Sequence, residues 1–381
     1  MSEQREAPIL VRNKDVEHIV NAAANIGHYA AEVQIDKRFS LLVTADVHRC
    51  RKQVLSAVEY LNGMKALDAG ICLGDMQGSN FIENDGTWYT TAVNEAKKPF
   101  YTVIGNHDGG NSAKAKISGT KQQVFDKFIA PTMEQIGIEG LDKTYYAVNF
   151  DEYKVTLIVL DNYDVPDERD AQGDFVVHRG VDYISQAQAD WFVQTLANVP
   201  QDYHVLIARH SFPGKAITHN GPWTILNKNL TNGEPGCCCE IIPDIVNAWM
   251  NGTTFEQEYK VGAALTSTLS NPAVLPPVTV KADFTARGEG VLIGYIVGHE
   301  HWDWQGVSER YPRQQIHSFQ SSANDGWQNY CSDLPRLEGT KAEDCITVLS
   351  VDHKNRVLYM VRVGSNITNM LVDRTYISFA Y

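Results

Sequence analysis

The 381-residue sequence lacks any apolar run that approaches a membrane span of roughly 18 residues, and its charged N-terminus lacks the apolar core of a signal peptide. It also lacks an excess of basic residues, because 33 Lys and Arg face 46 Asp and Glu for a formal net charge of −13. Extended binding to nucleic acid depends on clustered Lys and Arg. These absences favour a cytoplasmic protein that neither enters a membrane nor binds extended nucleic acid.

The spacing of the cysteines argues against a disulfide-bonded protein and against a zinc site built from clustered thiolates. The seven cysteines include the adjacent run Cys237-Cys238-Cys239, and neighbouring cysteines are poorly placed for ordinary disulfides. The CxxC spacing of clustered zinc-binding thiolates is absent. We therefore expect reduced thiols in a globular protein of ordinary composition, with 43% hydrophobic and 21% charged residues.

Apolar runs of strand length alternate with helical patterns along the chain. The run FSLLVTADVH at 39–48 precedes a helical pattern at 51–65 that places Val54, Leu55, Val58 and Leu61 on one face. Unbroken apolar runs predict strands buried on both faces, as in α/β layers. Further runs lie at 69–75, 99–108, 153–161, 203–210, 291–301, 315–320, 345–352 and 356–364, and the last two suggest an antiparallel hairpin.

We interpret residues 1–381 as one domain with two additions. An amphipathic helix at 14–33 belongs to an N-terminal extension that ends near residue 36. The stretch from about 211 to 290 is rich in Gly, Pro, Asn and Thr, and we expect an irregular insertion that forms part of the substrate pocket rim. A helix at 185–196 should turn Trp191, Phe192 and Leu196 inward.

Five of the predicted strands end in side chains that bind metals. Ligands gather at the carboxyl ends of strands in open α/β sheets, so these residues should converge. In an extended backbone, residues i and i+2 share a face, so each i, i+2 pair can aim at one place. A lone His or a GD turn has a duller explanation, but the set together predicts a centre for Mn, Fe or Zn. The residues are Asp46 and His48, Asp75, Asn106, His210, and His299 with His301.

The motifs DVH, GD, GNHD, ARHSFP and GHEH, in this order over residues 46–301, resemble those of the calcineurin-like metallophosphoesterase family. The resemblance implies an α/β fold, a four-layer α-β-β-α sandwich of two mixed sheets. It also implies two divalent metal ions (Mn, Fe or Zn). One would bind Asp46, His48 and His301, the other would bind Asn106, His210 and His299, and Asp75 would bridge them. The helix at 185–196 also resembles the Q-x-x-W helix of bacterial members, which is a weaker signal.

The same resemblance implies the reaction. A small phosphorylated substrate, a phosphomonoester or phosphodiester, would be hydrolysed by a metal-bridging hydroxide, with His107 as the catalytic residue that assists the leaving group. Two alternatives are a nuclease on the same scaffold and a catalytically silent phosphate-ligand binder or scaffold. The acidic net charge argues against the nuclease, and the complete set of ligand residues argues against the silent binder. The oligomeric state stays open.

Departures from better-known members narrow the class. Ser/Thr protein phosphatases carry Asp where this chain has Gly78, so that activity is disfavoured, and the metal-binding Tyr of purple acid phosphatases is excluded at the same position. Without that Asp, what orients His107 is open. Asp108 is either the orienting carboxylate or the cap of a turn.

Three more residues each have two interpretations, and two others have one. Arg49 either contacts phosphate or starts a helix in solvent. Trp302 and Trp304 either wall a pocket or pack in the core. Asn162, with its neighbour Tyr163, ends another strand and is a candidate to face the site.

Overall fold

The described residues form two mixed sheets that pack face to face. The computed structural model describes residues 38–78, 80–82, 86–110, 112–177, 179–212, 215–218, 224–226, 240–260, 275–301, 303–319, 321–323, 344–364 and 376–381. The predicted helix at 14–33, Cys237–Cys239 and Trp302 therefore lie outside the described residues. In that part of the chain, Cys50, Cys72 and Cys345 form no disulfide.

One sheet has six strands. Its spatial order is β16 (Tyr376–Ala380), β15 (Val357–Gly364), β14 (Cys345–Asp352), β1 (Phe39–Thr44), β2 (Ala69–Cys72) and β3 (Phe100–Thr102). Strands β1, β2 and β3 are parallel, whereas β14, β15 and β16 join antiparallel. The hairpin predicted at 345–364 is confirmed, because β14 pairs with β15 from Cys345 to Asp352.

The other large sheet has eight strands. Its order is β4 (Tyr146–Phe150), β5 (Val155–Val159), β6 (His204–Ala208), β11 (Val291–Val297), β13 (Gln315–Ser318), β12 (Trp304–Ser308), β7 (Lys215–Thr218) and β8 (Thr224–Leu226). The four central strands β5, β6, β11 and β13 run parallel, and the outer pairs are antiparallel. Each sheet therefore contains parallel strands, and the predicted ligands follow the carboxyl ends of these strands.

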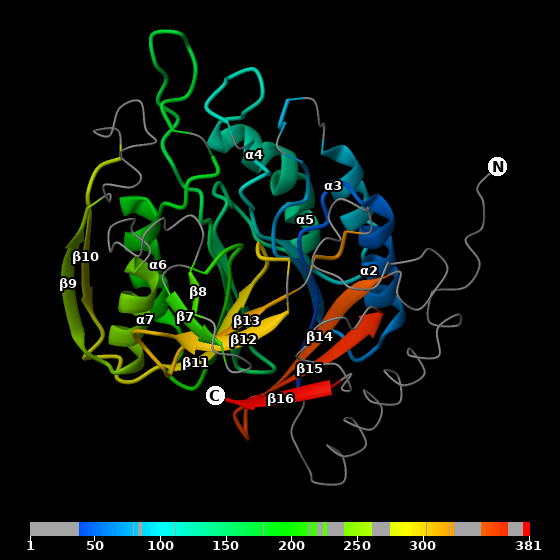
Figure 1. The fold of residues 1–381 in the computed structure, drawn as a ribbon. Helices are drawn as coiled ribbons and strands as arrows, with labels where there is room; N and C mark the ends of the chain where they lie inside the picture. The colour runs from blue at the N-terminus through cyan, green and yellow to red at the C-terminus, as the bar shows by residue number, and fades with distance from the viewer. Residues whose placement is uncertain are drawn as a thin grey trace.

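Helices cover the outer face of each sheet. On the side of the six-stranded sheet lie α2 (Arg51–Gly63), α3 (Thr87–Val93), α4 (Lys121–Phe128), η2 (Ala130–Thr132) and α5 (Met133–Ile136), and on the other side lie α6 (Gln186–Asn198) and α7 (Ile241–Met250). Figure 1 shows the layers in order, with the pair β9 (Thr254–Tyr259) and β10 (Val278–Asp283) outside α6 and α7. The four-layer α-β-β-α sandwich is confirmed.

Two apolar clusters explain why the strand runs are unbroken. Leu157 of β5 and Leu206 of β6 belong to the cluster that includes the space between the sheets. The alternate residues Ile158 and Ile207 belong to the cluster under α6 and α7. Because successive side chains of a strand point to opposite faces, both faces of β5 and β6 are buried.

The predicted helices have the expected buried faces, except that Leu55 of α2 and Trp191 of α6 are only half-buried. Val54, Val58 and Leu61 of α2 are buried, and so are Phe192 and Leu196 of α6. Trp191 is only half-buried and packs at the edge of the second cluster, against Tyr145.

The expectation that residues from about 211 to 290 are irregular was wrong for the described residues, whereas their place at the substrate pocket rim stays a prediction. This stretch contributes β7 and β8 to the eight-stranded sheet, the buried helix α7, and the pair of β9 with β10. Helix α7 reads IIPDIVNAWM and carries Pro243 in its first turn, where a missing N–H costs little. The Pro and Gly content concealed these elements from the sequence pattern. In the described residues, no helix is long and apolar enough to cross a membrane.

Candidate metal centre

All seven predicted ligands lie in short loops that directly follow β1, β2, β3, β6 and β11, and the structure brings them together. The pairs Asp46 with His48 and His299 with His301 converge, but the extended backbone assumed for them was wrong. Asp46 has φ of 49° and His48 has φ of 39°, so the chain turns sharply at both residues.

Left-handed backbone is concentrated at these positions. Eight described non-glycine residues have positive φ, and five of them are predicted ligands: Asp46, His48, Asp75, His299 and His301. This conformation costs on the order of 1 kcal/mol or more for each residue with a Cβ atom. Strain of this kind persists where the surrounding fold imposes it, and it gathers at functional sites.

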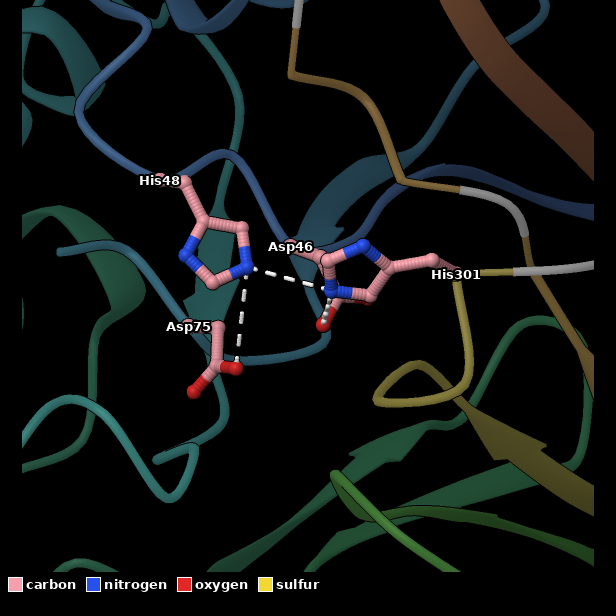
Figure 2. A group of neighbouring side chains, drawn as sticks. All are labelled: Asp46, His48, Asp75 and His301. Atoms are coloured by element: carbon pink, nitrogen blue, oxygen red, sulfur yellow. Dashed lines mark hydrogen bonds and ion pairs between the residues drawn. The ribbon is translucent and has the colours of Figure 1, made fainter. Parts of the chain in front are cut away.

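The first group consists of Asp46, His48, Asp75 and His301, all buried, with potential ligand atoms within 4.8 Å of one another. Figure 2 shows the two imidazoles facing each other, with His48 Nε2 at 3.1 Å from His301 Nε2. His48 Nε2 lies 3.8 Å from Asp75 Oδ2, and His301 Nε2 lies 3.4 Å from Asp46 Oδ1.

The second group consists of Asp75, His210 and His299. His210 Nε2 lies 3.3 Å from Asp75 Oδ2 and 3.2 Å from His299 Nδ1. The amide oxygen of Asn106 completes it, at 3.0 Å from His210 Nε2 and 3.1 Å from His299 Nδ1. Asp75 belongs to both groups.

The chemistry of these atoms fits cations. In each group, imidazole nitrogens converge on carboxylate or amide oxygens and on each other, so their lone pairs would repel unless a proton or a cation lay between them. The donor set of imidazole, carboxylate and amide oxygen suits divalent ions such as Mn, Fe and Zn. These residues could hold two metal ions, with Asp75 contributing to both.

Electrostatics keeps the carboxyl groups of Asp46 and Asp75 ionised. Burial raises the pKa of Asp75, but the charges of His210 and His107 outweigh it and hold the pKa well below its usual range. Burial also raises the pKa of Asp46, and His301 outweighs it and lowers that pKa. Burial lowers the pKa of His210, but Asp75 and Asp46 outweigh this effect and raise that pKa to about 10. For His299, burial and then the charge of His210 lower the pKa to about 4. The cluster therefore pairs ionised carboxylates with imidazoles whose protons a cation can displace.

Glycines before the ligands are required by close packing. A Cβ atom on Gly105 would lie 2.2 Å from Asp75 Oδ1, and one on Gly298 would lie 2.6 Å from Asp46 Oδ2. Both distances are far below van der Waals contact, so the GN and GH pairs of the motifs let one loop pass against the ligand of another.

His107 lies on the open side of the centre. Its side chain is 21% exposed, against 0–7% for His48, His210, His301, Asp46 and Asp75. The ring Nε2 lies 3.9 Å from Asp75 Oδ2, and the ring meets His48 edge-on at 5.2 Å between centroids. The oxygens of Asp108 instead accept backbone N–H groups of Gly105, Asp75 and Gln77, which favours the turn-capping interpretation.

The remaining candidates lie around this centre in different ways. Asn162 supports His210 from behind, because its Oδ1 accepts the His210 backbone N–H at 3.2 Å, and Tyr163 packs its ring 5.9 Å from the His210 ring. Trp304 belongs to the second apolar cluster, as the packing interpretation holds. Arg49 is exposed just before α2.

The side chain of Arg49 lies against Gly78. A Cβ atom there would lie 2.7 Å from Nη2 of Arg49. The guanidinium therefore lies against the Gly78 backbone, and any larger residue would displace it.

Supporting residues went unnoticed in the sequence. Ser321 donates to the Asp46 carbonyl at 2.7 Å, and Gln77 is fully buried beside Asp108. Ser321 lies outside the motifs, and Gln77 occupies an unspecified position between Asp75 and Gly78, so the motifs singled out neither residue.

Similarity to known proteins identifies the family of this chain. A sequence profile described as calcineurin-like phosphoesterase matches residues 39–266, which is more than half of the chain. The chain belongs to the calcineurin-like phosphoesterase family. A search among curated proteins finds no significant match.

Several solved structures resemble this family member remotely. A structure named PhoD has a TM-score of 0.43 at 9% identity and covers 87% of this chain and 73% of its own. The protein TT1561 of Thermus thermophilus has a TM-score of 0.39 at 10% identity, with 85% and 99% covered. The 5'-nucleotidase precursor from the same organism has a TM-score of 0.36 at 10% identity and covers 82% of this chain, which spans about half (51%) of that protein.

Proposed function

We propose that this protein hydrolyses a phosphomonoester or phosphodiester of a small molecule at a centre for two divalent cations. The observation that carries the proposal is Asp75, which belongs to both ligand groups and is 1% exposed. In this proposal, Asp46, His48 and His301 would hold one ion, Asn106, His210 and His299 would hold the other, and Asp75 would contribute to both. Mn, Fe and Zn all suit these ligands.

When bound, a pair of such ions neutralises phosphoryl oxygens and lowers the pKa of a coordinated water. The chain's own residues supply the geometry. Asp46 is fixed by the His299 backbone N–H, which donates to its two oxygens at 3.1 and 3.0 Å. Asp75 is fixed in the same way by the His107 backbone N–H at 2.9 Å. Preorganised groups of this kind need not rearrange when charge develops on the substrate.

His107 is positioned to serve the leaving group. Its side chain is more exposed than those of His48, His210 and His301, and its ring edge stands beside His48. A leaving oxygen needs a proton, and a protonated imidazole on the open side can donate it. General-acid assistance of this kind contributes roughly 10² to 10⁴ in rate.

Charge favours a small substrate over a nucleic acid. The formal net charge of −13 opposes extended contact with a polyanion, whereas a single phosphate group needs only the cations of the centre. This separates the proposal from a nuclease. A silent binding protein would be expected to lose ligand residues or His107, and all of these residues converge here.

A turnover panel in Mn²⁺ tests the proposal. It comprises p-nitrophenyl phosphate, bis-p-nitrophenyl phosphate, cyclic nucleotides, nucleotide sugars and single-stranded DNA, each with wild type and Asp75→Asn. We expect turnover of small esters that the substitution abolishes. Turnover of DNA in preference to the small esters would support the nuclease, and silence with both ions bound would support the binder.

A further inference from the structure

The carboxylate of Asp108 links two ligand-bearing loops at a single buried point. Its Oδ2 accepts the backbone N–H groups of Gly105, at 2.7 Å, and Asp75, at 2.9 Å. Its Oδ1 accepts the backbone N–H of Gln77 at 3.2 Å, and the residue is 0% exposed. Gly105 directly precedes Asn106, whereas Asp75 and Gln77 belong to the loop after β2.

Two further bonds connect the same loops. Gln77, also 0% exposed, donates its side-chain N–H to the Asp108 carbonyl at 2.7 Å. In the opposite direction, the His107 backbone N–H donates to Asp75 Oδ1 at 2.9 Å. Each loop is thus held by a side chain of the other loop.

These bonds begin where the sheet no longer joins the two segments. The last paired residues of β2 and β3 are Cys72 and Thr102, and the Val103 N–H still bonds to the Cys72 carbonyl at 2.9 Å. Beyond this point no strand pairing holds Asp75 and Asn106 at a fixed separation. The hydrogen bonds to the Asp108 carboxylate connect the two segments there.

Only a carboxylate satisfies this arrangement. Three N–H groups point at two oxygens, and both oxygens of a carboxyl group carry lone pairs that can accept them. Burial and then the charge of Asp75 raise the pKa of Asp108 well above its usual range, although the N–H donors of Gly105 and Gln77 oppose that rise. An amide of the same shape has one oxygen, so its NH₂ group would face at least one of these buried N–H donors. Burial leaves no water to accept the displaced bond, so the loops must shift.

We propose that Asp108 is a positioning residue that sets the separation of Asp75 and Asn106, and with it the spacing of the two cation sites. The inference rests on the proposed two-cation centre. It assigns Asp108 no contact with substrate or reacting atoms.

The test compares Mn²⁺ binding by the full chain in wild type, Asp108→Asn, Gln77→Met and Asp244→Asn. Gln77→Met removes the supporting donor without changing charge. Asp244→Asn is the matched control, because Asp244 is also buried and hydrogen-bonded, to Tyr259 and Tyr311, but lies on α7. Titration calorimetry gives stoichiometry and affinity, and electron paramagnetic resonance reports the exchange-coupled Mn²⁺ pair.

We expect Asp108→Asn to lower the affinity roughly 10- to 100-fold and to weaken the coupled signal, as for other residues that support metal ligands. Gln77→Met should change both in the same direction by less, and Asp244→Asn should change neither, even where its melting temperature falls. Wild-type affinity and pair signal in Asp108→Asn would overturn the inference. So would an equal loss in Asp244→Asn.

Two other outcomes are decisive. Should Asp108→Asn fail to fold, unchanged binding by Gln77→Met would overturn the inference, and weakened binding would support it. A wild-type protein that binds fewer than two ions would refute the proposed centre itself, which is distinguishable because it appears before any substitution.

Discussion

The Nε2 atoms of His48 and His301, which are 253 residues apart in the chain, lie 3.1 Å from each other in a buried site. Two imidazole nitrogens at this distance need a shared proton or a cation, because their lone pairs otherwise repel. Both residues have left-handed backbone, so the loops hold this arrangement at a cost before any ion binds. Substitutions of different residues of this centre should therefore have different effects on metal binding, turnover and stability.

Single substitutions should separate the two ion sites. We expect His301→Ala to keep one ion, His299→Ala to keep the other, and Asp75→Asn to lose both, because only Asp75 belongs to both ligand groups. Elemental analysis after dialysis measures the stoichiometry. The control is His353→Ala, which should keep both ions. His353 Nε2 hydrogen-bonds to the Asp202 carbonyl at 2.8 Å. Two ions retained by Asp75→Asn would contradict the assignment of a bridge.

His107→Ala should separate chemistry from binding. The His107 ring lies on the open side of the centre, with its Nε2 3.9 Å from Asp75 Oδ2. Loss of the imidazole should reduce kcat by roughly 10² to 10⁴ while both ions stay bound. The effect should be smaller for esters whose leaving group needs no proton, such as p-nitrophenol, than for alkyl esters. Steady-state kinetics with both leaving groups, together with metal content, checks this. An equal loss for both, or a loss of metal, would argue against the role.

Gly105→Ala should disable the centre through packing alone. The added methyl group would lie 2.2 Å from Asp75 Oδ1 and 2.3 Å from the Asp75 backbone nitrogen, so Asp75 must move. Overpacking of this kind costs about 1 to 3 kcal/mol of unfolding free energy. We expect lower thermal stability and weak metal binding. Gly140→Ala, at an open left-handed position with φ of 68°, should lose some stability and no metal.

A histidine pair far from the centre should make stability depend on pH. Burial, and then the charge of His353, lower the pKa of His204 to about 3, and the two rings stack at 3.9 Å. The folded state therefore favours neutral His204, so stability is full above the unfolded-state pKa near 6.5 and falls as pH drops toward 3. From pH 7 to 5 the loss is at most about 2 kcal/mol, because solvent near the pair screens part of the effect.

Urea unfolding at both pH values checks the histidine prediction. His204→Gln should flatten the pH dependence by about that amount, because the titrating group is gone. An unchanged pH slope in His204→Gln would assign the effect to other groups.

The sequence determined the layers and the position of each ligand along the chain. Unbroken apolar runs such as 155–159 and 204–208 can only be buried on both faces, and the polar residues that follow them must lie at strand ends. Local periodicity carries this information, so β5, β6 and α2 were predictable, and so was the meeting of Asp75 with His210 and His301 once the family motifs were recognised.

Only the tertiary structure decided how those residues meet. The pairing of β7 with β12 and the N–H groups that Asp75 and Gln77 donate to Asp108 depend on partners far away in the chain. The left-handed backbone at Asp46 and His299 was equally absent from the sequence pattern. Such contacts leave no pattern in a local window, because the conformation of a loop is set by the surfaces that enclose it and not by its own residues.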